Sequence, residues 1–458
     1  PSPMEERGDL VIIEGQPYPK RVGGQRQKLV ARIRLHGFQQ TMEEVAYTWF
    51  NRLLAIRFME LHAYLDHGYR VLSHPEGQEL PEILEHAEHL ELPGLDKSKV
   101  IDLKLDGTKD AELYRMLLIA QCNALHRAMP FLFERIDDET ELLLPDNLLH
   151  SDSLIRKLVI SIDEADWQEI EIIGWLYQFY ISEKKDQVIG KVVKSEDIPA
   201  ATQLFTPNWI VKYMVQNSLG AQWLATYPDS PLKEEMEYYI EPVEQTDVVR
   251  RQLDEITPKE LDPEELTLMD PACGSGHILV EAYDLFKAIY LERGYRLRDI
   301  PRLILEKNLY GLDIDDRAAQ MAGFALLMKA QADDRRLLSP ENPPVLNVMA
   351  IQDSKDIDAE EIARTLLPEE QFEWIPNNDL LPHTVSQPTL SKKVIFEGDG
   401  RALNKLIECF RNAKSFGSLI TIPNGLPLTK LRALVEPSKH DDIFIQRAKN
   451  LLRPILKQ

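Results

Sequence analysis

Helical spacing of apolar residues dominates the first two hundred residues of the chain. Thr41 and Glu44 have the spacing of a capping box, a pattern that predicts the start of a helix. Behind them, apolar side chains recur at roughly helical spacing through about Leu65. They are Val45, Trp49, Leu53, Ile56 and Phe58. A second apolar stripe predicts a helix over about 163–185. We therefore expect a mainly helical N-terminal domain over 1–195, with these aromatic rings in its core rather than on a base-stacking surface.

The pattern changes in the second half of the chain. Residues 227–265 are acidic and punctuated by proline, which predicts a connector. After Leu266, short apolar runs alternate with helical patterns, and this alternation is typical of an α/β sheet. The fold class that we predict is therefore α/β, with a second domain over 196–458. Residues 355–445 follow no clear period, and we interpret them as a mixed insertion within that domain.

Composition and charge narrow the class of protein. Hydrophobic residues make up 44% of the 458 residues, which excludes a mainly disordered chain. The 75 acidic residues outnumber the 53 basic ones, and the net charge of −22 argues against a grip on nucleic acid over the whole surface. The three cysteines form no CxxC pair or Cys/His cluster, so we predict neither a metal site nor a disulfide framework. These features favour a reduced, cytoplasmic protein that does not enter a membrane.

One basic stretch near the start stands apart from the acidic average. It contains Lys20, Arg21, Arg26, Lys28, Arg32 and Arg34. Charge runs of this kind usually form a solvated helix face, and we favour that interpretation. A contact with phosphate groups is the alternative.

The strongest chemical pattern is the run from Asp270 to Gly276, Asp-Pro-Ala-Cys-Gly-Ser-Gly. An apolar strand leads into a loop of small residues, and a helix follows. Gly274 and Gly276 permit a tight turn and let the backbone approach a ligand closely. Asp270, at the end of the strand, can accept hydrogen bonds from the ammonium group of a ligand.

A helix start precedes this loop in the chain. Thr206 is a suitable N-cap residue and Pro207 suits the first helical position, so a helix is expected from there to about Gly220. The free N–H groups at such an end suit a carboxylate. Taken alone, the pattern predicts no more than a well-capped structural helix.

Two further apolar strands end in acidic residues. One ends at Asp313, as a bidentate hold on ribose hydroxyls requires, and Asp315 is expected to cap the helix that follows. An extra helix over about 301–307 precedes this strand. The other strand ends in Asp353 and Ser354. A rival run ends at Asp399, but we prefer Asp353 because it follows the second strand's helix directly.

The run from Asp270 to Gly276 resembles the first cofactor motif of N6-adenine DNA methyltransferases. The Thr-Pro pair resembles the motif of the same enzymes that contacts the methionyl end of S-adenosylmethionine, and its place before the loop matches their gamma order. The resemblance implies a Rossmann-like sheet that binds S-adenosylmethionine. It also implies that Asp313 holds the ribose, that Ile314 packs on the adenine ring and that Asp353 accepts from the adenine amine. The cofactor-binding residues implied are Phe205, Thr206, Pro207, Asp270, Ala272, Gly274, Gly276, Asp313, Ile314, Asp353 and Ser354.

Longer runs extend the resemblance over most of the chain. Residues 47–52, 57–61, 174–180 and 198–207 are similar to the helical N-terminal region of the PglX methyltransferases of BREX phage-defence systems. This resemblance implies methyl transfer to adenine N6 in duplex DNA, which marks self DNA. It implies DNA, and other phage-defence proteins, as partners.

One motif of that family is missing. Its members hold the target amine with an (Asp/Asn)-Pro-Pro-(Tyr/Phe) loop, which also stacks on a flipped base. Residues 342–345 read Asn-Pro-Pro-Val, without the aromatic residue and without an apolar strand before them, so we expect an ordinary loop. We therefore predict a cofactor-binding N-terminal portion whose sheet is incomplete at the C-terminus, with no catalytic residue of its own and weak binding to DNA.

Three alternatives remain open at this point. The chain could be the methyltransferase half of a fused restriction-modification enzyme. It could belong to a methyltransferase that acts on protein or RNA. It could also be a non-catalytic scaffold whose acidic helical domain docks partner proteins.

Overall fold

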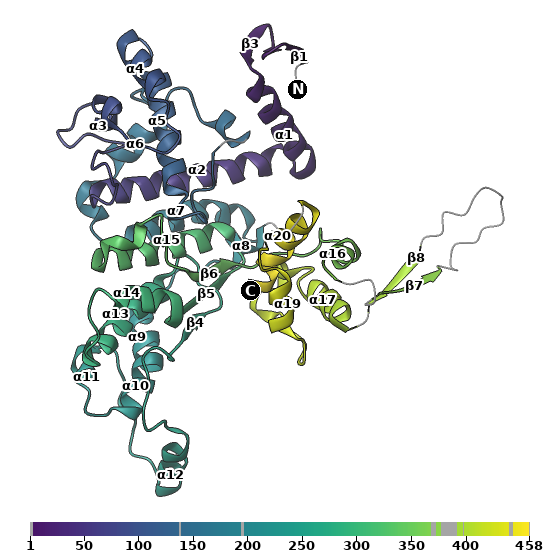
Figure 1. Ribbon diagram of the computed structural model, residues 1–458. Helices are drawn as coiled ribbons and strands as arrows, with labels where there is room; N and C mark the ends of the chain where they lie inside the picture. The colour runs from purple at the N-terminus through teal and green to yellow at the C-terminus, as the bar shows by residue number, and fades with distance from the viewer. Residues whose placement is uncertain are drawn as a thin grey trace.

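The computed structural model describes residues 3–136, 139–193, 197–367, 372–376, 392–396, 398–438 and 443–457. A helical N-terminal half lies against helix α15 (Asp316–Asp333), which packs on a small central sheet, and the C-terminal helices lie beside that sheet (Figure 1). In the described part of the chain, we find no helix with both the length and the apolar character needed to cross a membrane.

The chain begins with three short strands that the sequence pattern did not predict. They are β1 (Met4–Arg7), β2 (Leu10–Ile13) and β3 (Gln16–Pro19), and they form an antiparallel meander. Two helices follow, α1 (Lys20–His36) and α2 (Phe38–Leu61).

The predicted capping box is wrong. The helix boundary falls at Gly37, whose φ of 86° breaks α1 from α2 and favours glycine. Thr41 consequently lies inside the first turn of α2, where its hydroxyl donates to the carbonyl oxygen of Gly37 at 2.8 Å. Trp49 and Phe58 are buried in the core, as predicted.

The remaining helices of this half share one hydrophobic core with α2. They are α3 (Glu82–Glu85), α4 (Lys97–Asp106), α5 (Asp110–Leu125), α6 (Leu154–Ser161) and α7 (Glu171–Val188), with 3-10 turns at η1 (Ala87–His89), η2 (Glu139–Leu143) and η3 (Glu164–Trp167). The long helix expected over 163–185 is therefore a short turn followed by α7. Helices α3 and α4 pack on α5.

The basic stretch near the start forms part of α1, and at least three of its side chains form ion pairs within the protein, those of Lys20, Arg21 and Arg32. Arg32 lies 2.9 Å from a carboxylate oxygen of Glu44 and 3.5 Å from one of Glu139. Arg21 lies 3.2 Å from Glu141. The pairs of Arg21 and Arg32 hold α1 against α2 and η2. Part of the stretch therefore stabilises the fold, which neither the solvated-face nor the phosphate-contact interpretation included.

A helical segment connects the N-terminal half to the part of the chain that contains the central sheet. It consists of α8 (Ile198–Thr202), α9 (Asn208–Val215), the π turn η5 (Gln216–Gly220) and α10 (Ala221–Thr226). The helix expected to stop near Gly220 continues to Thr226. Gly220 has helical backbone angles, and a Cβ there would lie 2.5 Å from the sulfur of Met236, so this glycine serves close packing rather than helix termination. The connector then contains α11 (Leu232–Glu235) and α12 (Asp247–Ile256).

The central sheet has three parallel strands in the order β4-β5-β6. Its elements are β4 (Leu268–Asp270), α13 (His277–Glu292), α14 (Ile300–Leu303), the π turn η6 (Ile304–Asn308), β5 (Leu309–Asp313), α15 (Asp316–Asp333), the 3-10 turn η7 (Arg335–Leu338) and β6 (Asn347–Ala350). The structure has strands at all three predicted places, but β6 ends at Ala350, so Asp353 and Ser354 follow this strand at a distance and do not end it. The extra helical segment before β5 and the loop at 342–345 are confirmed. Asp315 caps α15 as predicted, because its side chain accepts from the backbone N–H of Arg317 at 3.0 Å.

The C-terminal elements build a second core. The helices that contribute to it are α16 (Ala359–Leu366), α17 (Gly398–Cys409), α18 (Ala413–Phe416), α19 (Leu428–Leu434) and α20 (Ile443–Lys457). The same part of the chain also contains the antiparallel strands β7 (Phe372–Pro376) and β8 (Lys392–Phe396) and the turn η9 (Gly417–Leu419). The run before Asp399 falls in β8, which pairs with β7 and not with the central sheet; the side chain of Asp399 lies outside the described residues. The domain boundaries given above stay a prediction.

Candidate functional site

A cavity opens at the end of β4, and two distant segments of the chain line it. One segment precedes α9 and the other is the glycine-rich loop between β4 and α13. The lining residues are Gln203, Leu204, Phe205, Thr206, Asp270, Ala272, Cys273, Gly274, Ser275, His277 and Ile278. The cavity encloses about 350 Å³ of space, part of it open to solvent.

The backbone of the loop requires its two glycines. Gly274 and Gly276 have φ angles of 53° and 90°, in the left-handed region that other residues rarely adopt. A Cβ on Gly276 would lie 2.9 Å from the Cβ of Ala322 in α15. The loop therefore packs directly on α15, and its turn exposes backbone to the cavity.

Asp270 places a carboxylate in the cavity wall. It is only 8% exposed, and its Oδ1 accepts from the backbone N–H of Ala272 at 3.1 Å. Burial raises the pKa of this carboxyl, because loss of water disfavours the charged form. A cationic group in the cavity would restore that lost stabilisation.

Asp313 lies behind the loop, outside the cavity wall. Its Oδ2 accepts from the N–H of Gly274 and its Oδ1 accepts from the N–H of Asp315, both at 2.8 Å. Burial raises the pKa of Asp313, while these two hydrogen bonds lower it. A carboxylate has about four acceptor positions, so both oxygens keep capacity for a further donor.

The segment before α9 differs from its predicted geometry by one position. Pro207 is the N-cap, with ψ at 142°, and α9 begins at Asn208. The prediction that Thr206 caps the helix is therefore wrong. Thr206 and Phe205 instead face the cavity, and Pro207 is not among its lining residues.

Three other predicted residues face the C-terminal helices. The side chain of Ile314 packs against the second core and lies 3.1 Å from where a Cβ on Gly417 would stand. Asp353 accepts from the backbone N–H of Lys414 at 2.7 Å. Ser354 is 2% exposed and its hydroxyl donates to the carbonyl of Ile407. None of the three lines the cavity, so their role toward a cofactor stays a prediction.

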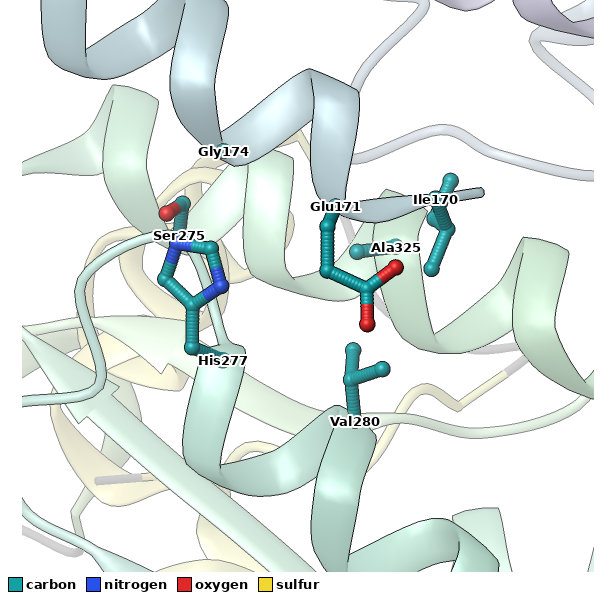
Figure 2. A pocket seen from close by; sticks show the side chains of 7 residues that line it. All are labelled: Ile170, Glu171, Gly174, Ser275, His277, Val280 and Ala325. Atoms are coloured by element: carbon teal, nitrogen blue, oxygen red, sulfur yellow. The ribbon is translucent and has the colours of Figure 1, made fainter. Parts of the chain in front are cut away.

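Helix α7 contacts the back of the glycine-rich loop, which no pattern in the sequence indicated. A second, smaller cavity marks this contact (Figure 2), lined by Ile170, Glu171, Gly174, Ser275, His277, Val280 and Ala325. His277 lines both cavities, with Ser275 and Glu171 beside its ring in Figure 2. Burial lowers the pKa of His277, which favours the neutral imidazole at physiological pH.

Gly174 allows α7 to approach the glycine-rich loop closely because it has no side chain. A Cβ at this position would lie 2.5 Å from Cε1 and 2.6 Å from Nε2 of the His277 ring. Gly174 is the first residue of the run 174–180, one of the runs that resemble the PglX family. This part of the run therefore packs against the glycine-rich loop. Gln203, His277 and their neighbours were missed because cavity lining depends on tertiary contacts that local patterns do not encode.

Comparison with known proteins agrees with this geometry. Residues 245–365 match the family model described as "MmeI, DNA-methyltransferase domain". The chain is 54% identical to the adenine-specific methyltransferase BrxX of Escherichia coli O9:H4 (strain HS), over 92% of this chain and 35% of that protein. It is 40% identical to the adenine-specific methyltransferase PglX of Lacticaseibacillus casei (strain Zhang), over 68% of this chain and 28% of that protein.

A more distant relative shares a smaller region. It is a Methanocaldococcus jannaschii protein whose name describes a type II restriction enzyme and methyltransferase, 26% identical over 37% of this chain and 15% of that protein. The chain spans about a third of the length of BrxX and less of the other two. By its identity to BrxX and PglX over most of its residues, the chain belongs to the PglX-type family of adenine-specific methyltransferases of BREX systems.

Proposed function

We propose that the chain binds S-adenosylmethionine in the cavity between residues 203–206 and the glycine-rich loop. We further propose that it is the cofactor-binding portion of a site-specific DNA adenine-N6 methyltransferase that marks self DNA in phage defence. One observation carries the proposal: Phe205 and Thr206 meet Asp270 and Gly274 in one cavity, although they come from segments far apart in the chain.

The residues present fit this cofactor. Asp270 offers a carboxylate to its ammonium group, and Asp313 lies behind the loop with acceptor capacity for ribose hydroxyls. Phe205 and Ile278 supply apolar surface, and Gly274 lets the backbone approach. When bound, S-adenosylmethionine supplies a methyl group that its sulfonium activates, so the protein's part is to orient the reactants.

The sheet supports the same proposal. Three parallel strands joined by α13 and α15 have the form of one half of a Rossmann-like sheet, in which ligands bind beyond the carboxyl ends of the strands. The cavity lies at that edge, next to Asp270 at the end of β4.

We propose that the chain of 458 residues does not transfer methyl groups by itself. It contains no (Asp/Asn)-Pro-Pro-(Tyr/Phe) sequence; residues 342–345 lack the aromatic residue and form a loop. The parent protein would act on duplex DNA. The net charge of −22 leads us to expect weak DNA binding by this chain.

Binding of S-adenosylhomocysteine, measured by calorimetry, tests the cofactor proposal. We expect the unchanged chain to bind. Asp270→Asn should bind at least about tenfold more weakly, since a hydrogen bond to a charged group contributes about 1.5–3 kcal/mol. Asp229→Asn, at an exposed position outside the cavity, is the matched control and should bind like the unchanged chain. No heat of binding for the unchanged chain would overturn the proposal, and retained binding of partner proteins would then favour the scaffold alternative.

Labelled S-adenosylmethionine and host DNA test the second part. We expect no label in the DNA after incubation with the chain alone. Incorporation of methyl groups would show that the chain carries its own catalytic loop, and methylation of protein or RNA would change the proposed substrate.

The distant relative supports one alternative, in which the parent is a fused restriction-modification enzyme. This alternative shares the cofactor site and adds a nuclease. Cleavage of plasmid DNA that requires a divalent metal ion would favour it over a methyltransferase alone.

A further inference from the structure

Helix α7 carries a tyrosine whose hydroxyl lies between the two cofactor segments. Tyr177 is 0% exposed. Its hydroxyl lies 2.9 Å from Oδ2 of Asp315 and 3.2 Å from Oε1 of Gln203. A phenol has one hydrogen to donate, and the charged acceptor at the shorter distance is the stronger partner. The side chain thus links the helical N-terminal half with both sides of the cavity.

A chain of hydrogen bonds connects Asp315 to the glycine-rich loop. The backbone N–H of Asp315 donates to Oδ1 of Asp313, and Oδ2 of Asp313 accepts from the N–H of Gly274. Asp315 also caps α15 through the N–H of Arg317. A shift of Asp315 would therefore move Asp313 and the turn at Gly274 together.

Gln203 connects Tyr177 to the other wall of the cavity, which the segment 203–206 forms. Lys185, also in α7, donates from Nζ to the backbone carbonyl of Gln203 at 2.8 Å. The side chain of Gln203 lines the cavity, and its Nε2 lies 3.6 Å from where a Cβ on Gly274 would stand. Tyr177 and Lys185 together hold the start of the segment that carries Phe205 and Thr206.

We propose that Tyr177 is a positioning residue, which sets the separation of the 203–206 segment from the turn at Gly274. The proposal rests on the function proposed above, because the separation matters only if a ligand occupies the cavity. Tyr177 itself is not in the cavity wall, so it acts through Gln203 and Asp315. The helical N-terminal half is then part of the cofactor site.

The test compares Tyr177→Phe with Tyr114→Phe. Tyr114 is also 0% exposed, lies in the same core, and donates from its hydroxyl to the carbonyl of Val71 at 3.0 Å, away from the cavity. Each variant loses one buried hydroxyl and keeps its ring, so both should lower Tm by a similar few degrees. We expect S-adenosylhomocysteine to bind about tenfold more weakly to Tyr177→Phe and within twofold of normal to Tyr114→Phe.

A double-mutant cycle separates positioning from general loosening. If Tyr177 acts through Gln203, Tyr177→Phe combined with Gln203→Met should weaken binding no more than about twofold beyond the more severe single variant. Equal affinity of Tyr177→Phe and the unchanged chain would overturn the proposal, as would equal weakening by both tyrosine variants. Failure of the unchanged chain to bind would instead overturn the proposed function.

Discussion

Gly276→Ala is expected to lower the free energy of unfolding by about 3 kcal/mol and to remove measurable binding of S-adenosylhomocysteine. Two costs add at this position. The φ of 90° strains any residue that carries a Cβ, and that Cβ would lie 2.9 Å from the Cβ and 3.0 Å from the Cα of Ala322. The loop would have to move away from α15, and the cavity wall would move with it.

Gly294→Ala is the matched control for this prediction. Gly294 has a φ of 79°, but a Cβ there would meet no described atom within 4 Å, so only the backbone strain applies. We expect a cost of about 1 kcal/mol and unchanged ligand binding. Urea denaturation measures both stabilities. Equal costs for the two variants would show that the loop does not depend on its contact with α15.

Arg57→Met is expected to lower the free energy of unfolding by about 3–5 kcal/mol, as removal of one partner from a buried ion pair does. The Arg57 and Glu60 side chains are both 0% exposed, with 2.7 Å between Nη1 and Oε1. Arg57 also donates to the hydroxyl of Ser73 at 2.7 Å. Without the guanidinium, the carboxylate of Glu60 would lose its ion-pair partner inside the core.

An exposed ion pair on the same half provides the comparison. Lys99 and Glu112 lie 2.9 Å apart with side chains about half exposed, so water screens their attraction. Glu112→Gln should cost less than about 1 kcal/mol in the same urea experiment. A loss of similar size in Arg57→Met would mean that the buried pair contributes little to the stability of this core.

The sequence alone was sufficient to predict the elements that depend only on neighbouring residues in the chain. The strands β4, β5 and β6 follow from short apolar runs, and Asp315 was recognised as a cap because capping requires only its own turn. The predictions were wrong at positions where a contact between distant segments determines the local structure. Gly220 resembles a helix stop in sequence, yet it lies inside a helix because Met236 packs on it.

The candidate site divides in the same way. Asp270 and Gly274 were predicted from the composition of their loop and line the cavity, whereas Gly276 packs on α15 and does not line it. Gln203 and His277 were missed because α7, distant in sequence, determines what faces the cavity. Asp353 and Ser354 were expected at the cofactor, but they bond to C-terminal helices in a region whose sequence follows no clear period.

The connector helix α12 has a consequence for how the chain can be divided. It buries none of its residues and extends from the body of the protein (Figure 1). The segments on either side of it remain in one core, because Trp223 packs in the same cluster as Phe286 and donates to Glu292 in α13 at 3.0 Å. A chain nicked at Arg250 would therefore stay assembled as two complementing fragments. We expect covalent continuity through α12 to be dispensable for bringing the Thr-Pro segment to the glycine-rich loop, because the two segments are held by their packing in one core.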